Sequence, residues 1–87
     1  MIRSKSFIKR DIGTQTVIVA VGEATKTFHG MISVNKTGAF IWDLLENETT
    51  LDAITEALVE KYDIDAATAR ADADAFIESL KGVGAVA

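Results

Sequence analysis

Residues 30–45 read GMISVNKTGAFIWDLL, and this stretch decides the fold because its hydrophobic period changes partway along it. Before Asn35 the period is two, which predicts a short strand with Ile32 and Val34 on one face. After Asn35 the period lengthens to about three and a half, which is typical of a helix with one apolar side. The stretch therefore predicts a strand, 30–34, that leads directly into a helix.

The helix expected after this strand covers residues 37–46, and either Asn35 or Thr37 is suited to cap its amino end. The apolar stripe of this helix is formed by Phe40, Ile41, Leu44 and Leu45. Trp42 lies beside the stripe, so we expect a half-buried core aromatic. The alternative is a tryptophan that anchors a partner at the surface, a position in which this residue is favoured.

Two more helices are predicted towards the carboxyl end. Thr49 and Asp52 have the spacing of a capping box, and the apolar residues behind them indicate a helix that ends near Tyr62. Asp65 is a suitable N-cap for a third helix over residues 66–81. These two helices complete a trio that begins at residue 37.

The first third of the chain predicts β-structure. Residues 7–10 form a short candidate strand, and the β-branched run 16–21 forms a second one. Both faces of the second strand are apolar, which is expected of a central strand or of one covered on both sides. Residues 23–29 are mixed and polar and are interpreted as a connection. Three strands followed by three helices predict one α+β domain over residues 1–87.

Composition restricts the chemistry that the chain can perform. Its 87 residues are 48% hydrophobic and 25% charged, which indicates one small folded domain and argues against intrinsic disorder. The absence of cysteine excludes disulfides and thiolate sites, and His29 has no second histidine with which to share a metal. The glycines lack phosphate-binding spacings, and Gly82 stands where a left-handed C-cap is expected. We therefore expect no catalysis, no metal and no cofactor.

Charge is distributed unevenly along the chain. The net charge of −4 argues against a general nucleic-acid binder. Residues 1–36 carry six Lys and Arg against two acids, whereas residues 37–87 carry three against eleven. This division is explained by two solvent-exposed faces that carry different charges. It is explained equally by two surfaces that bind different partners. No apolar run approaches the roughly 18 residues of a membrane span, so a soluble cytoplasmic protein is expected.

The helical trio is also compatible with a winged helix-turn-helix reader of DNA. Such a reader places Arg, Lys, Asn or Gln of its recognition helix against phosphates and base edges. The third predicted helix instead carries three acids and two basic residues, and the second is no more basic. The sequence therefore disfavours DNA binding.

A small sheet leaves open edges, and an exposed edge strand is a template for another strand. The third predicted strand begins with Gly30, which lets a second backbone approach closely. If this strand lies at an edge, an extended peptide can pair with it by strand addition. Residue chemistry alone leaves this as one of several open functions.

Three segments of the chain resemble the PqqD family. Residues 31–45, MISVNKTGAFIWDLL, are similar to its hydrophobic-Asn-x-Thr/Ser-x-x-x-Ile-Trp-x-Leu segment. Residues 50–65, TLDAITEALVEKYDID, resemble its second helix and following turn, and residues 72–84, DADAFIESLKGVG, resemble its closing Phe-x-x-x-Leu-x-x-x-Gly. The resemblance extends over about residues 7–86.

This resemblance implies three antiparallel strands followed by three helices in a winged helix-turn-helix-like arrangement. It also implies a non-catalytic adaptor in the biosynthesis of ribosomally made, post-translationally modified peptides. Such an adaptor binds the leader of a precursor peptide as a strand added to its third strand, in a groove closed by its third helix. The peptide-binding residues implied for this chain are Phe28, Gly30, Met31, Ile32, Ser33, Val34, Arg70, Ala73, Asp74, Ile77 and Lys81.

The side-chain roles implied on the third helix combine helical spacing with the geometry of the family. Arg70 and Lys81 would pair with acids of the leader, and Ala73 and Ile77 would line an apolar pocket. The connection before the third strand is longer than is common in the family and brings Phe28 near the groove.

The expected partners are the precursor peptide and a modifying enzyme, such as a radical SAM enzyme or a leader protease, with no nucleic acid and no membrane. A monomer and a strand-exchanged dimer both remain open. The alternative functions are a winged-helix DNA-binding regulator and a structural small subunit of a larger enzyme. A proline or charged residue at Ile32 or Ser33 is expected to abolish peptide binding in a domain that stays folded.

Overall fold

The computed structural model describes residues 1–86, so Ala87, the last residue of the expected domain, lies outside the described residues. Its elements are β1 (Phe7–Ile12), β2 (Gln15–Ala20), the 3₁₀ helix η1 (Gly22–Lys26), β3 (Met31–Val34), α1 (Lys36–Leu44), α2 (Leu51–Tyr62) and α3 (Ala66–Gly82). The predicted order of three strands and three helices is confirmed. The connection before β3 contains η1, which the sequence reading treated as irregular.

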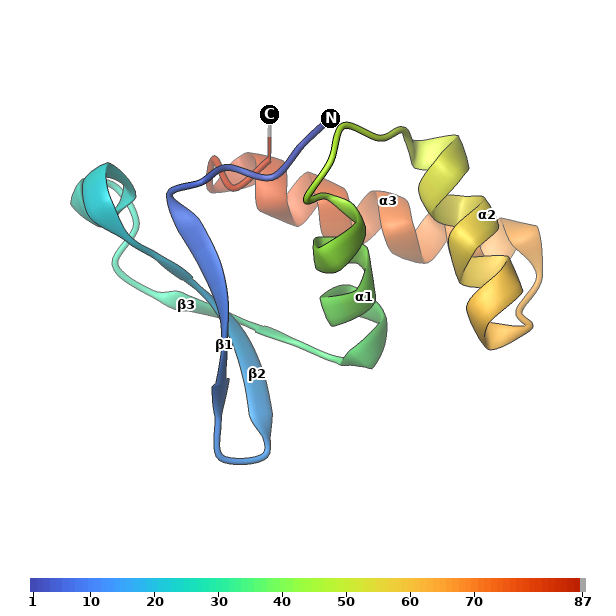
Figure 1. Ribbon diagram of the computed structural model, residues 1–87, viewed down its shortest axis with the longest axis horizontal. Coiled ribbons are helices and arrows are strands. Elements are labelled where there is room, and N and C mark those ends of the chain that lie inside the picture. The colour runs from blue at the N-terminus through green and yellow to red at the C-terminus, as the bar shows by residue number, and fades with distance from the viewer. Residues whose placement is uncertain (87) are drawn as a thin grey trace.

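The three strands form an antiparallel sheet in the order β1-β2-β3, and the helices all lie on one side of it (Figure 1). The expectation of a central second strand is confirmed. Gly13 has φ +63° at the two-residue turn between β1 and β2, a conformation that glycine adopts without strain.

The core lies between one face of the sheet and the helices. Ile18 contributes from β2, and Trp42 from α1 is 1% exposed, so this tryptophan is fully rather than half buried. The guanidinium of Arg3 lies 5.4 Å from the Trp42 ring centroid, and its Nη1 donates a 3.0 Å hydrogen bond to the Trp42 carbonyl oxygen. These contacts occupy the tryptophan within the fold and leave no surface for a partner.

Short polar side chains cap the amino ends of the three helices. The Asn35 side chain caps α1, accepting from the Gly38 amide at 2.8 Å, and the Asp65 side chain caps α3 as predicted. The cap of α2 is Thr50 and not Thr49, because the Thr50 hydroxyl accepts the hydrogen bond from the α2 backbone. The capping-box prediction was therefore displaced by one residue.

The left-handed glycine after α3 is Gly84, with φ +79°, whereas Gly82 remains the last helical residue. The prediction for Gly82 was wrong because the helix continues one residue further than expected. The turn at Gly84 returns the chain so that Val86 pairs with Arg3 in an antiparallel bridge. The first residues of the chain consequently lie beside the segment that follows α3 (Figure 1). In residues 1–86 we find no helix with the length and apolarity to cross a membrane.

Candidate functional site

The edge of β3 that faces away from β2 is open among the described residues. β3 pairs with β2 over Met31–Val34 and is the last strand of the sheet. In an antiparallel ladder, alternate residues turn both N–H and C=O groups away from the neighbouring strand. About half of the β3 backbone is therefore available to pair with another strand.

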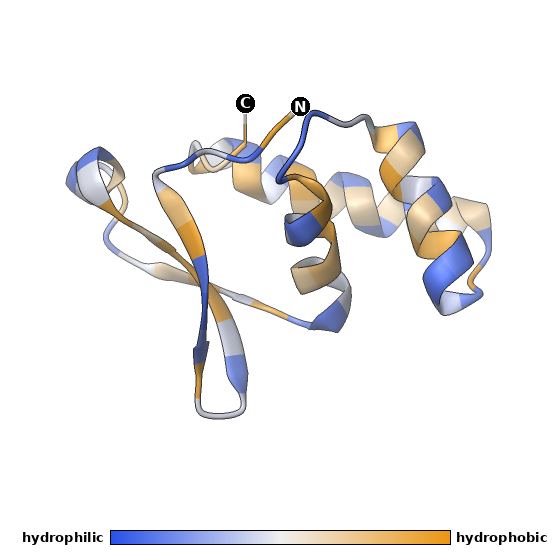
Figure 2. Cartoon of the chain, in the orientation of Figure 1, coloured by the Kyte–Doolittle hydropathy of each residue, from blue (hydrophilic) through white to orange (hydrophobic). Residues whose placement is uncertain are grey.

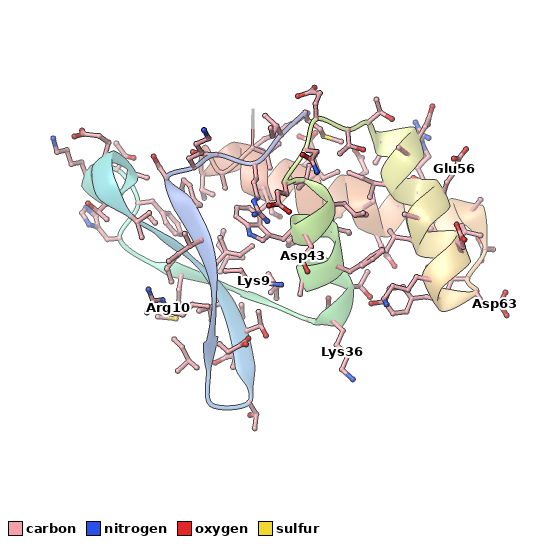
Figure 3. All side chains as sticks on the ribbon, in the orientation of Figure 1. Lys9, Arg10, Lys36, Asp43, Glu56 and Asp63 are labelled. Atoms are coloured by element: carbon pink, nitrogen blue, oxygen red, sulfur yellow. The ribbon has the colours of Figure 1, made fainter. Side chains whose placement is uncertain are left out.

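The opposite edge of the sheet is different, because β1 carries charged residues along it. Figure 2 shows the middle of β1, where Lys9, Arg10 and Asp11 lie, as hydrophilic between hydrophobic ends. The Lys9 side chain turns toward the helices and forms a 2.7 Å ion pair with Asp43 of α1 (Figure 3). Charged side chains that point inward protect an edge strand from further pairing. The sheet thus offers β3, and not β1, to an added strand.

A hollow of about 280 Å³ lies beside the end of β3, between α1 and α3. The residues that line it are Asn35, Thr37, Gly38, Ile41, Asp72, Ala75 and Phe76. A Cβ atom at Gly38 would lie 3.2 Å from both the Phe76 ring and Val34 Cβ, so α1 approaches β3 and α3 as closely as a glycine permits. No local pattern of the sequence around Gly38 indicated this close approach.

The face of α3 toward the hollow differs from the one expected. Ala73 is 0% and Ile77 2% exposed, and both belong to the core cluster. Asp72, Ala75 and Phe76 line the hollow instead. Ala73 and Ile77 therefore support the site from beneath, and the half-buried ring of Phe76 is the large apolar surface that α3 presents there.

The charged residues expected on α3 lie away from the hollow. Arg70 pairs with Asp52 of α2, and Arg70 and Asp74 line a different depression between these two helices. Lys81 stands in the last turn of α3 and is 3.8 Å from Glu78. The structure does not bring these three side chains together with the hollow beside β3.

The expected site residues on β3 and immediately before it do lie close to one another. Ile32 and Val34 are half-buried against the core, as their alternation predicted, while Met31 and Ser33 are exposed on the other side of β3. Phe28 precedes β3 as a half-buried residue that packs on the core, and its ring would lie 3.7 Å from a Cβ atom at Gly30. Its ring centroid also lies 5.9 Å from that of core Phe7.

The remaining polar groups show structural roles. The pKa of Asp65 is lowered, chiefly by hydrogen bonds from the backbone N–H and the hydroxyl of Thr68, which is the capping interaction of α3. Within residues 1–86 no group of three or more His, Asp or Glu side chains is placed to hold a metal ion. The site is thus a backbone edge beside a hollow of mixed polarity, in which Phe76 is the large apolar residue.

Comparison with known proteins identifies the family and a solved structure with the same fold. The sequence matches the model of the family of coenzyme PQQ synthesis protein D (PqqD) over residues 15–86, from the start of β2 to the end of the described chain. The chain belongs to the PqqD family. A solved structure with the same fold is that of TbiB1 in complex with the TbiA(beta) leader peptide, with a TM-score of 0.76 and 21% sequence identity. The match covers 98% of this chain and 93% of TbiB1. No curated protein matches the sequence.

Proposed function

We propose that this PqqD-family chain, acting as one domain, binds the leader of a ribosomally made precursor peptide and presents the peptide to a modifying enzyme. The leader adds a strand to the open edge of β3 and places side chains in the hollow lined by Phe76. The enzyme is of a kind such as a radical SAM enzyme or a leader protease, and the complex works in the cytoplasm, where precursor peptides are made. The chain itself performs no chemistry and uses no cofactor.

The open edge of β3 beside the hollow that contains Phe76 is the observation that carries this proposal. If two of the four β3 residues bond outward, an added strand gains about four hydrogen bonds, each with a net value of roughly 0.5–1.5 kcal/mol. Ordering a flexible leader offsets much of this gain, so side-chain burial in the hollow must supply the rest of the affinity and the sequence preference. The solved complex of TbiB1, which has the same fold, contains a leader peptide and supports the same use of the fold here.

The helices give no support to the alternative of a DNA reader. On α3 the basic residues Arg70 and Lys81 both lie beside acids, Asp52 and Glu78. A recognition helix needs basic or amide side chains that are available to phosphates and base edges. A leader-binding adaptor instead uses the β3 edge and the hollow beside it. A purely structural subunit has no need of an open strand edge.

Backbone methylation of the leader tests strand addition without altering the protein. Peptides with one N-methyl group at each successive position of the leader encoded with this chain are titrated into the ¹⁵N-labelled protein. Because strand pairing uses alternate backbone N–H groups, binding should weaken at every second position. Shifts are expected in residues 28–38 and on the Asp72–Phe76 side of α3. A uniform response to methylation would rule out strand addition.

The two positions proposed for mutation in β3, Ile32 and Ser33, differ in burial. Ile32 is half-buried on the core, so a charge there would destabilise the fold along with the site. Ser33 is exposed, and its Oγ accepts a 2.8 Å hydrogen bond from Gln15 Nε2. Ser33→Pro is thus the cleaner variant, and we expect it to lose leader binding with a native ¹⁵N spectrum. A folded Ser33→Pro protein that binds normally would contradict the edge-strand model.

A further inference from the structure

The face of the sheet that points away from the helices is a second apolar surface. Successive residues of a strand point to opposite faces, and the strand register therefore defines which side chains share this outer face. The residues of the outer face are Ile8, Arg10, Ile12, Gln15, Val17, Val19, Met31 and Ser33. The helices α1, α2 and α3 all lie on the opposite side (Figure 1).

Two observations describe the outer face, which is apolar at its centre and exposes large apolar side chains at its margins. Val17 is 0% exposed yet lies outside the main core cluster, so its own neighbours on the outer face bury it. Ile12 and Met31, at 49% and 56% exposed, are two of the three exposed large hydrophobic residues of the described chain. An apolar sheet face that the helices leave uncovered is a candidate surface for protein binding.

Charge indicates the chemistry of the occupant. Arg10 is the one charged residue of the outer face, and it points away from the helices, opposite in direction to Lys9 (Figure 3). Asp11, the one acid of the three strands, lies on the other face and accepts a 2.9 Å hydrogen bond from the Thr16 hydroxyl. An apolar surface with a carboxylate opposite Arg10 complements this face.

A second copy of the chain is a poorer occupant than a different protein. A two-fold contact between two outer faces would bring each Arg10 toward a surface that carries the other Arg10 and no acid. Contact of the outer face with the acidic helical part of another copy would be heterologous, and such contacts propagate into rings or open filaments. A separate protein avoids both difficulties.

The size of the outer face links this occupant to the leader. Three strands about 4.8 Å apart and about five residues long present roughly 250 Å², well below the roughly 800 Å² that each partner buries in a stable interface. A leader strand added to β3 extends the same face and places alternate side chains next to Met31 and Ser33. The leader-bound sheet therefore offers a larger surface than the free protein.

We propose that the outer face, extended by the bound leader, is the docking surface for the modifying enzyme, which contacts it through an apolar patch bearing a carboxylate. This inference rests on the proposed function and adds the surface by which the enzyme is recruited. Because enzyme and leader share one continuous face, each should raise the affinity of the chain for the other by the same factor.

The test measures two affinities for each variant: that of the enzyme encoded beside this chain, by biolayer interferometry, and that of the leader, by fluorescence anisotropy. Ile12→Glu changes the outer face two strands away from the leader edge. Ile2→Glu is the matched control, because Ile2 is a 38% exposed isoleucine that lies before the strands. We expect Ile12→Glu to weaken enzyme binding at least tenfold with leader affinity within twofold, and Ile2→Glu to change neither.

A reversal of charge at Arg10 supplies a second variant. Arg10→Glu should weaken enzyme binding, and the residual affinity should depend less on salt than that of the wild-type chain. Enzyme affinity unchanged by both outer-face variants, no enzyme binding by the leader-bound wild-type chain, or self-association that Ile12→Glu abolishes would each overturn the docking proposal. Failure of the leader to bind the wild-type chain would instead refute the proposed function.

Discussion

Removal of the Phe76 ring tests the hollow beside β3. Phe76 is half-buried, and the part of its ring that remains exposed is available for a leader side chain to cover. A phenylalanine buries about 150–250 Å² in full. With roughly a quarter of Phe76 exposed, the remainder is about 50 Å², and its burial contributes roughly 1.3 kcal/mol at 25 cal/mol per Å². Phe76→Ala is therefore expected to weaken leader binding about tenfold.

The same substitution also destabilises the fold, and Phe40→Ala controls for that effect. Phe40 is likewise a half-buried aromatic that packs against the core. Its ring meets Tyr62 of α2 edge-on at 5.9 Å, and it does not line the hollow. Each variant should lose about 1–3 kcal/mol of stability, less than a fully buried phenylalanine would. Only Phe76→Ala should change leader affinity.

Leader affinity is measured by fluorescence anisotropy at a temperature at which urea titration shows both variants to be fully folded. A tenfold weakening confined to Phe76→Ala supports the hollow as the side-chain subsite. Equal weakening in both variants would show that affinity follows general stability. An unchanged affinity in Phe76→Ala would remove the hollow from the binding site altogether.

Three further predictions follow from other contacts of the structure. Gly38→Ala should cost about 0–2 kcal/mol in urea unfolding, because overpacking against Phe76 outweighs the gain in helix propensity, and should weaken leader binding. Asp65→Ala should lower the melting temperature at pH 7. The pKa of Asp65 is lowered in the folded protein, so the carboxylate stabilises the fold while it is charged. The difference in melting temperature between wild type and variant should therefore persist at pH values above the ordinary aspartate pKa of about 3.9, and shrink as the pH falls through the folded-state pKa. Lys9→Val, which removes the ion pair with Asp43, should promote self-association through β1, seen as a mass that rises with concentration in light scattering.

The order of elements was predictable because each change of period is a local property of the sequence. The switch at Asn35 from alternation to a helical stripe set the boundary between β3 and α1, and the structure retains it. Caps were predictable only to within one residue at α2, since Thr49 and Thr50 have the same capping chemistry. Which of the two threonines caps α2 depends on the residue at which the chain enters the helix.

The orientation of α3 was not predictable from spacing alone. Alanine occurs on every side of the sequence AATARADADAFIESLKG, so small apolar residues mark no single buried face. Contact with α1 and α2 buries Ala69, Ala73 and Ile77, which leaves Phe76 toward β3. The close approach at Gly38 likewise depends on residues far away in sequence. Both features arise from packing among elements, and a single local pattern contains neither.

The open edge of β3 would accept a second copy of β3 as readily as a leader if backbone bonding alone decided. Two copies paired through Met31–Val34 gain only the bonds of a four-residue strand, and each leaves its own Phe76 hollow to be filled by something else. A leader gains the same bonds and also covers the ring. At about 1.4 kcal/mol for each factor of ten, the roughly 1.3 kcal/mol from Phe76 favours the leader about tenfold at equal concentration. On the proposed function, we therefore expect the hollow to direct an unspecific backbone edge toward a peptide and away from strand exchange.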